Sequence, residues 1–458
     1  MWSGGPPPCG GAFFCRRRGA RHYQRSGAGM ISLRSLLPDM QKAVGSSGIQ
    51  LLLMLVTTPF MTRLFAPESY AAFGLIGQAA ALASTMGMLS LPEVYVLQKT
   101  FQERAELLNV SMRLLLITFS LTSLVALGLS IYYEWLGGDI TVRPAELMWL
   151  PLLYCVLSLK NLLNVIAVHA KCFNATALLR IVDPLVGRIG TLLLGALIVA
   201  NAFSMLAGLT LGAAAAISTG WRYLPSRNRF VLRRVLTLRV PLWPMIKRFR
   251  REVLYLCILG QAVPIANVLL LSFIVSRYGE GEGGQFVLAQ SIIQLPIAMV
   301  AFAIAPIFFR HVIELVDRKV PGKPVFRSTY RVGAAAMVLA FLGMMPLVLF
   351  AETLFPIVFG DNWLMAGKIA AWLAVPGMFA FCRMVIESVF RLTDTIQLKS
   401  YIDLTASVLQ VAFAWIYFGS MPVLEVVCYL SLITASAHIV ALILSLWVVY
   451  RFESAYAS

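Results

Sequence analysis

Twelve apolar stretches, each close to 20 residues long, fall into two sets of six on either side of a strongly basic segment, residues 222–251. In hydrocarbon, every backbone N–H and C=O must be bonded within its own segment, and about 20 apolar residues in a helix cross the bilayer. The sequence therefore predicts an all-α membrane protein with about 12 transmembrane helices in two six-helix lobes. We expect the spans at residues 43–63, 70–92, 109–132, 148–170, 175–200, 203–221, 253–276, 285–308, 332–350, 366–390, 398–418 and 425–449.

The composition supports the same class. Hydrophobic residues make up 59% of the 458 residues, charged residues make up 13%, and the mean hydropathy is +0.80. Soluble domains average about 45–50% apolar and about 25% charged residues. The composition therefore excludes an ordinary soluble domain.

The lysines and arginines alternate between the two sides of the predicted membrane. With the amino terminus inside, the inner segments hold 29 of them and the outer loops hold four. Cytoplasmic loops retain Lys and Arg, so we expect both termini to be cytoplasmic. The net charge of +17 follows mainly from this topology, and no nucleic-acid partner is expected. The basic segment is suited to anionic lipid headgroups.

The same pattern predicts four regions. Residues 1–41 form a cytoplasmic tail, residues 42–221 the first lobe, residues 222–251 a basic cytoplasmic linker, and residues 252–458 the second lobe. Residues 1–29 are rich in Gly, Pro and Arg, which predicts a disordered or non-native extension ahead of Met30. An Arg-rich transit peptide is the alternative.

The turn after the first span of each half repeats one spacing. Arg63 precedes Glu68 by five residues, and Arg277 precedes Glu282 by the same number. An even number of spans per half leaves both halves in the same orientation. We therefore expect two repeats related by an axis along the membrane normal.

Four short segments in both halves carry a family resemblance. They are 59–70 (PFMTRLFAPESY), 105–108 (AELL), 290–296 (QSIIQLP) with Phe308, and 359–366 (FGDNWLMA). With these segments in order, the chain resembles the polysaccharide exporters, the Wzx-type flippases of O-antigen and exopolysaccharide units in the MOP superfamily, which also holds MATE drug exporters and the lipid II flippase MurJ. Ala71 departs from the Gly usual in the family. Leu91 stands where many members carry Arg before the acidic residue that Glu93 matches, so a role for that Arg does not carry over.

The resemblance implies a central cavity and a function. It implies that the chain translocates a polyprenyl-diphosphate-linked oligosaccharide across the bacterial inner membrane by alternating access, for polysaccharide biosynthesis. The implied partners are this lipid-linked substrate, membrane lipids, a polysaccharide polymerase and glycosyltransferases. It implies neither a cofactor nor an enzymatic activity.

Cations inside the predicted spans of the first half are candidates for the substrate site. An intramembrane cation costs about 2.5–3.5 kcal/mol at a helix centre, so it usually faces a cavity or a partner. Lys160 and Asn164 lie on one stripe with Ala167 and Lys171, and Arg188 is similarly deep in the next span. We predict that Lys160, Asn164 and Arg188, assisted by Arg180, bind the diphosphate headgroup. The alternative is structural, an ion pair of Asp183 with Arg180 or Arg188.

The second half supplies further candidates. Arg383 and Glu387 are spaced i, i+4 on one predicted span, where they can pair, and Asp403 lies at a similar depth on the next. Arg383 is a further headgroup candidate. A carboxylate in a low-dielectric site takes up a proton more readily, so Glu387, Asp403 and Asp183 are candidates for ion coupling. The alternative is a pair that only stabilises the helix.

Two other functions remain open at this stage. A MATE-like antiporter of small organic cations would need acidic residues in the first lobe, where this sequence supplies cations. A membrane-embedded glycosyltransferase or ligase would need a large outer catalytic loop, and the outer loops are short. No Walker-type phosphate loop, metal-type cysteine spacing or catalytic His grouping is present in the sequence.

Overall fold

The computed structural model describes residues 33–95, 98, 100–136, 143–170, 172–224, 240–250, 253–317 and 322–457. Most of the predicted tail, residues 225–239 of the predicted linker, and Lys171 lie outside the described residues. Across the described ranges the regular elements are helices, and eight of these helices are long and apolar enough to cross a membrane. The chain is a multi-pass, all-α membrane protein, as predicted.

Six long helices form a first bundle. They are α2 (Leu33–Leu64), α3 (Pro67–Met86), α5 (Phe101–Leu136), α7 (Trp149–His169), α8 (Phe173–Leu197) and α9 (Ala202–Tyr223), with the short helices α4 (Leu91–Tyr95) and α6 (Pro144–Leu147) between them. The helix α2 begins ten residues before the predicted span. The reason is that apolar length marks only the part of a helix that suits hydrocarbon, and polar turns extend beyond it.

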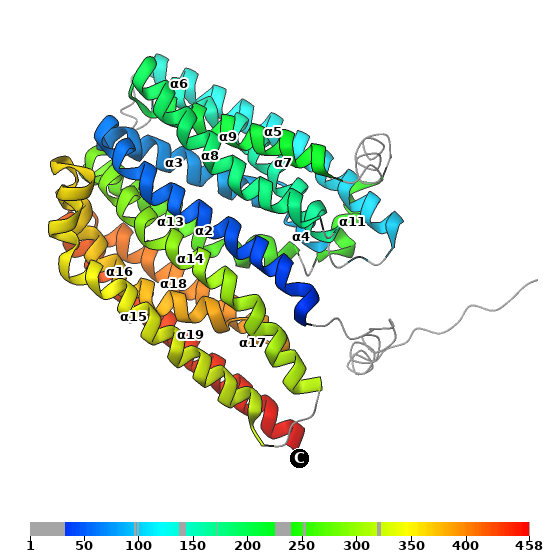
Figure 1. Ribbon diagram of the computed structural model, residues 1–458. Helices are drawn as coiled ribbons and strands as arrows, with labels where there is room; N and C mark the ends of the chain where they lie inside the picture. Colours follow the sequence, from blue (N-terminus) through cyan, green and yellow to red (C-terminus); the bar gives the residue numbers. More distant parts are fainter. Residues whose placement is uncertain are drawn as a thin grey trace, which may run out of the picture.

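The second bundle follows the short helix α11 (Leu242–Arg248). It consists of η1 (Val253–Ile258), η2 (Leu259–Gln261), α13 (Ala262–Tyr278), α14 (Glu280–Asp317), α15 (Pro324–Phe359), η3 (Asp361–Trp363), α16 (Leu364–Ile386), α17 (Val389–Leu392), α18 (Ile396–Tyr417) and α19 (Val423–Ala457). The two bundles lie side by side, the first drawn from blue to green and the second from green to red (Figure 1). We call the end of the molecule that carries α6 and η3 the α6 end, and the opposite end the α11 end.

The bundles meet along α3 and α14, which run in the same direction. The side-chain amide of Gln78 donates to that of Gln290 at 3.1 Å, and a Cβ at Gly74 would lie 2.4 Å from Val287. The paired residues are 212 and 213 positions apart, close to the offset between the two Arg–Glu turns. Equivalent positions of the two halves therefore face each other, as an axis parallel to these helices would require.

At the α6 end the two bundles are in close contact. The indole N–H of Trp363, a fully buried side chain, donates to the carbonyl of Thr62 at 2.9 Å. The ring of Tyr70 meets that of Trp363 edge-on at 4.9 Å. A Cβ at Gly284 would lie 1.7 Å from the carbonyl oxygen of Pro67, so only glycine allows this approach. These contacts seal the α6 end.

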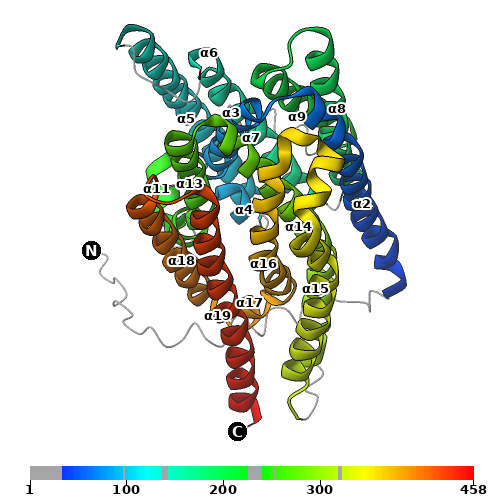
Figure 2. The same cartoon turned by 90° about the vertical axis from the view of Figure 1, so that its left-hand side faces the viewer.

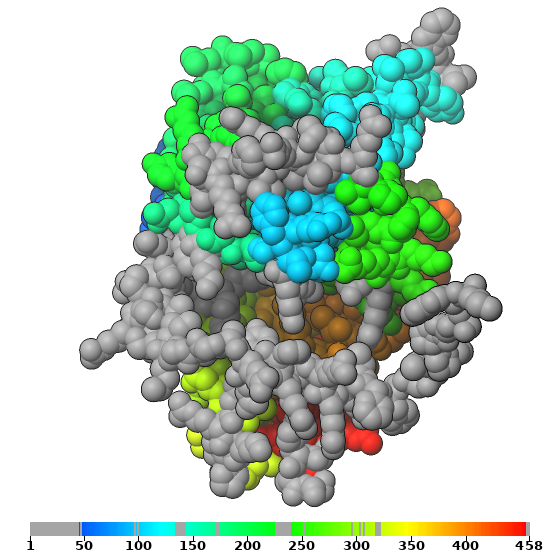
Figure 3. Space-filling model, turned by 90° about the vertical axis from the view of Figure 1, so that its right-hand side faces the viewer, coloured from blue at the N-terminus to red at the C-terminus, as the bar shows by residue number. Residues whose placement is uncertain are grey.

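The α11 end differs. Figure 3 views it directly and shows a surface hollowed between the two bundles, with orange atoms of the second bundle lying deep in the hollow. The structure is therefore closed at one end and hollowed at the other.

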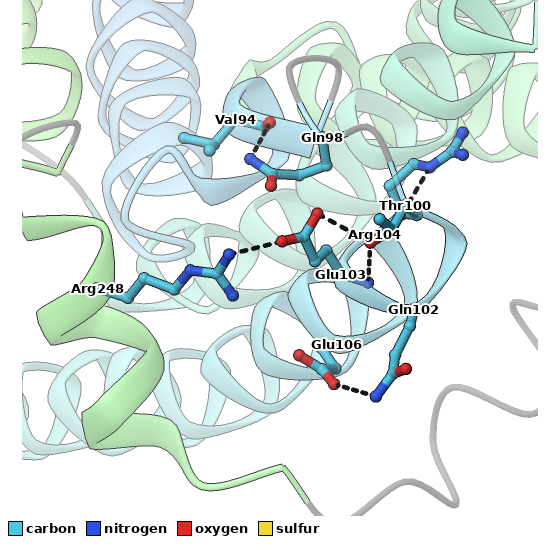
Figure 4. Close-up of polar contacts among 8 residues, drawn as sticks. All are labelled: Val94, Gln98, Thr100, Gln102, Glu103, Arg104, Glu106 and Arg248. Carbon is cyan, nitrogen blue, oxygen red and sulfur yellow. Dashed lines mark hydrogen bonds and ion pairs between the residues drawn. The ribbon is translucent and has the colours of Figure 1, made fainter. Parts of the chain in front are cut away.

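The helix α11 attaches the end of the linker to the first bundle. Arg248 forms an ion pair with Glu103 on the first turn of α5 at 2.6 Å (Figure 4). Arg113 donates to the carbonyl of Val240 at 2.9 Å, and the buried side chain of Met245 packs in a cluster with residues of α4 and α5. The chain therefore enters the second bundle only after it has been anchored on the first.

Candidate functional site

A cavity of about 400 Å³ lies within the second bundle. It is enclosed by α13, α14, α16, α18 and α19, and its volume is in the usual range of ligand sites. Five ionisable side chains line it: Arg383, Glu387, Lys399, Asp403 and His438. Three of these residues were predicted site residues, and the structure brings them together in one place.

Arg383 of α16 joins the two outer helices of the bundle. Its guanidinium donates to Asp403 of α18 at 2.5 Å and contacts the ring nitrogen Nδ1 of His438 of α19 at 3.2 Å. The Arg383 side chain is 7% exposed and that of Asp403 is 17% exposed. Such a buried pair is stable only when its hydrogen bonds are well made, so the position of Arg383 is closely fixed.

Two polar atoms at this cavity have no hydrogen-bond partner among the described residues. They are Nε of Arg383 and the hydroxyl of Ser431, whose residue is 1% exposed. A buried donor without a partner costs about 1–3 kcal/mol. Both atoms are themselves buried, so a polar ligand in the cavity would bond them only after the wall rearranges.

Glu387 pairs with Lys399 of α18 at 3.4 Å, and both side chains are about one third exposed. The predicted pair of Arg383 with Glu387 is therefore wrong. The reason is tertiary: Asp403 on the facing helix lies directly against the guanidinium, while Glu387 is at the end of α16 and meets the first turn of α18.

The remaining wall is mostly apolar, with uncharged polar groups among its residues. Gln410 donates to Thr434 at 2.7 Å across α18 and α19, and its neighbours in the cavity include amides and hydroxyls. The other uncharged polar residues of the wall are Asn267, Gln290, Gln294, Ser407 and Ser431. Amides and hydroxyls both donate and accept, which suits the hydroxyl groups of a sugar.

Lys160 and Arg188, two predicted cationic site residues of the first bundle, contact other helices of that bundle. Lys160 forms an ion pair with Asp183 at 2.7 Å, linking α7 to α8, with the two side chains 22% and 19% exposed. Asp183 therefore pairs with Lys160, and the structure shows neither of the two pairs considered from the sequence. Asn164 is half-buried and its carbonyl oxygen has no partner among the described residues, whereas Arg180 is exposed.

Arg188 lies between α8 and α2. Its guanidinium donates to the hydroxyls of Thr57 at 3.0 Å and Thr58 at 3.1 Å, and it approaches the sulfur of Met61. Arg188 and Lys160 do not belong to the wall of the cavity in the second bundle. Their predicted contact with substrate stays a prediction.

Sequence reasoning missed two of the ionisable residues at the cavity, His438 and Lys399. A usable signal was present, because Ser431 and Thr434 precede His438 at helical spacing, as Asp403 precedes Ser407 and Gln410. These two stripes line the cavity from neighbouring helices.

Among the described residues, no three His, Cys, Asp or Glu side chains are grouped so that they could hold a metal ion.

Comparisons with known proteins place the fold. No family model and no curated protein matches the sequence. Among solved structures, an inward-facing multidrug resistance MATE family transporter of the MOP superfamily matches with a TM-score of 0.66 and 17% identity, over 88% of this chain and 96% of that chain. The lipid II flippase MurJ, in an inward closed conformation, matches with a TM-score of 0.63 and 14% identity, over 88% of this chain and 87% of that chain.

A third structure is a MOP superfamily transporter from Pyrococcus furiosus, described as having a binding pocket of reverse polarity. It matches with a TM-score of 0.54 and 16% identity, over 91% of this chain and 95% of that chain. The chain therefore has the fold of MOP superfamily transporters.

Proposed function

We propose that the chain translocates a polyprenyl-diphosphate-linked oligosaccharide across the bacterial inner membrane by alternating access, for polysaccharide biosynthesis. The observation that carries the proposal is the mixed lining of the second-bundle cavity, where Arg383 and Lys399 adjoin amides and hydroxyls within a mostly apolar wall. A diphosphate is bound by cationic side chains, and a glycan is bound by groups that both donate and accept hydrogen bonds. The structural similarity to the lipid II flippase MurJ supports a fold suited to moving a lipid-linked headgroup.

Within this proposal, Arg383 and Lys399 bind the diphosphate. Each faces a carboxylate in this structure, Asp403 and Glu387 respectively, so an incoming diphosphate exchanges one acceptor for another. The released carboxylates then become free to take up a proton, which couples substrate binding to ion movement. Asp183, which holds Lys160, is the corresponding coupling candidate of the first bundle.

The first bundle supplies a second contact surface in the proposal. Lys160, Asn164 and Arg188 would meet the headgroup there, with Arg180 at the edge. Asn164 lies one helical turn from Lys160. The closed α6 end and the hollowed α11 end correspond to one of the two states that alternating access requires. In the proposed orientation the α11 end, with the basic linker and both termini, is cytoplasmic.

The test is a flux assay in proteoliposomes that contain a polyprenyl-diphosphate-linked oligosaccharide, with headgroup exposure read by a membrane-impermeant enzyme. Because charge-assisted hydrogen bonds contribute about 1.5–3 kcal/mol, Lys399→Gln should lower flux about tenfold or more. Lys368→Gln is the matched control, since Lys368 pairs with Glu352 away from the cavity. A wild-type protein that exposes no headgroup would refute the function.

A MATE-like antiport of organic cations is the second candidate, favoured by the carboxylates of Asp403 and Glu387 in the same cavity. The same variants separate the two functions. A cationic substrate should lose flux with Glu387→Gln and keep it with Lys399→Gln, whereas the diphosphate substrate requires Lys399.

A further inference from the structure

A groove of about 320 Å³ runs along the outside of the second bundle between α18 and α19. These helices lie side by side at the edge of the bundle (Figures 1 and 2). Its wall is mainly apolar and is formed by Tyr401, Ile402, Thr405, Ala406, Leu409, Ile433, Ser436, Ala437 and Val440. The groove faces outward, on the side opposite the cavity.

Two residues line both the groove and the cavity, Ala406 of α18 and Ala437 of α19. At this point the wall between the two spaces is one pair of alanine side chains, both of them partly exposed. We call this pair the alanine seam. Elsewhere the same two helices are joined by larger groups.

Polar links bracket the alanine seam along the helices. Toward the α6 end, Gln410 and Thr434 are hydrogen-bonded at 2.7 Å. Toward the α11 end, Arg383 holds Asp403 and His438 together. The alanine seam is therefore the weakest part of the wall. The unpartnered atoms of Arg383 and Ser431 lie on its cavity side.

We propose that the alanine seam is a lateral portal, and that the α18–α19 groove holds the isoprenoid chain of the lipid whose headgroup occupies the cavity. The inference rests on the proposed function and adds where the lipid enters. A diphosphate bound at Arg383 is within one helical turn of the alanine seam, so the chain attached to it can pass between the alanines into the bilayer. The groove then gives that chain an apolar surface, which is the favourable environment for hydrocarbon.

The position differs from a passage between the two bundles. The α3–α14 contacts close the bundle interface near the α6 end, whereas the groove opens directly on the lipid-facing side of α18 and α19. The lipid can therefore keep its chain in the membrane while the two bundles move relative to each other.

Photo-crosslinking tests which lipid occupies the groove. A photoreactive amino acid is placed at Leu409, which lines the groove, or at the adjacent Val408, which does not. The two side chains are similarly exposed, 54% and 57%, so they meet bulk lipid equally. In proteoliposomes with the lipid-linked oligosaccharide, mass spectrometry should recover the isoprenoid lipid at Leu409 and phospholipid at Val408. Recovery of phospholipid alone at both positions would overturn the proposal.

Closing the alanine seam tests the portal itself. Ala406→Phe should lower flux of the lipid-linked headgroup about tenfold or more, because the ring fills the passage. Ala412→Phe places the same ring on the exposed face of α18, outside both spaces, and should leave flux unchanged. Ala437→Phe repeats the test from α19.

The outcomes separate the two proposals. An active wild-type protein with equal flux in Ala406→Phe and Ala412→Phe refutes the portal alone. A wild-type protein that moves no lipid-linked headgroup refutes the proposed function, and the portal with it.

Discussion

Both bundles hold cations inside the membrane, but they hold them in different ways. In the first bundle, Lys160 ties α7 to α8 through Asp183, and Arg188 ties α8 to α2 through two threonine hydroxyls. In the second bundle, Arg383 also joins helices, yet it does so at the wall of a cavity and keeps an unpartnered N–H there. Arg383 therefore lies beside a space that can hold a ligand, whereas Lys160 and Arg188 lie outside the wall of that cavity.

The comparison teaches that an intramembrane charge is not by itself a binding site. The insertion cost of a cation is offset equally well by a neighbouring helix or by a polar cavity. What distinguishes them is the space beside the charge. By that measure the second bundle is the better candidate for the headgroup.

The largest expected effect is the loss of a carboxylate from the more buried pair. Asp403→Asn leaves the Arg383 guanidinium buried without a counter-charge, so we expect the free energy of unfolding to fall by about 3–5 kcal/mol. Asp183→Asn removes the partner of Lys160, which is more exposed, and should cost less, about 1–2 kcal/mol. Thermal unfolding in detergent measures both variants. Equal losses of unfolding free energy in the two variants would mean that the two ion pairs stabilise the protein equally.

Charge reversal sharpens the comparison. Lys160→Asp combined with Asp183→Lys restores a pair between α7 and α8, so the double variant should recover wild-type stability, while its flux should stay below wild type because the amine leaves its proposed contact with the headgroup. Arg383→Asp combined with Asp403→Arg should also recover stability without flux, because the guanidinium then leaves the headgroup position. Flux is measured in proteoliposomes. Wild-type flux in the Lys160 double variant would instead assign Lys160 to the structural pair alone.

A smaller effect is expected at the unpartnered hydroxyl of Ser431. Ser431→Ala removes a buried polar atom that has no partner among the described residues, so the free energy of unfolding should stay the same or rise by about 1 kcal/mol. Affinity for the diphosphate sugar should fall several-fold, since a ligand hydrogen bond is lost. Calorimetry and thermal unfolding separate the two effects. Unchanged affinity would show that the ligand does not reach this part of the wall.

Much of the fold could be predicted from the sequence. Apolar length and the alternation of Lys and Arg gave the helices and their two sets of six, because both follow from the bilayer rather than from tertiary packing. The helix ends were less predictable, as α15 shows: it covers Pro324–Phe359, well beyond the expected 332–350. Its first turn is held by Glu453, which accepts from the backbone N–H groups of Val325 and Phe326. No local sequence pattern predicts a helix cap that is supplied by a residue far away in the chain.

The candidate site was predictable in its residues but not in its pairings. The sequence identifies Arg383, Asp403 and Glu387 as costly in hydrocarbon, yet which carboxylate meets which cation depends on how α16 and α18 are placed. The helical spacing of polar residues that includes Lys160 and Asn164 occurs again around Asp403 and His438. A single helix stripe cannot tell whether it faces a cavity or another helix.

The smallest effect on stability is expected for Arg188→Met. The hydroxyls of Thr57 and Thr58 also donate to the carbonyls of Leu53 and Met54 at 2.7 Å, so they stay bonded when the guanidinium is removed. Methionine keeps the unbranched side chain between α8 and α2, and the free energy of unfolding should change by less than about 1 kcal/mol. Flux decides what Arg188 does. Wild-type flux in Arg188→Met would assign Arg188 to helix packing. Lost flux with intact stability, recovered in Arg188→Lys, would give the first bundle a charge that acts on the substrate and would remove the contrast between the two bundles.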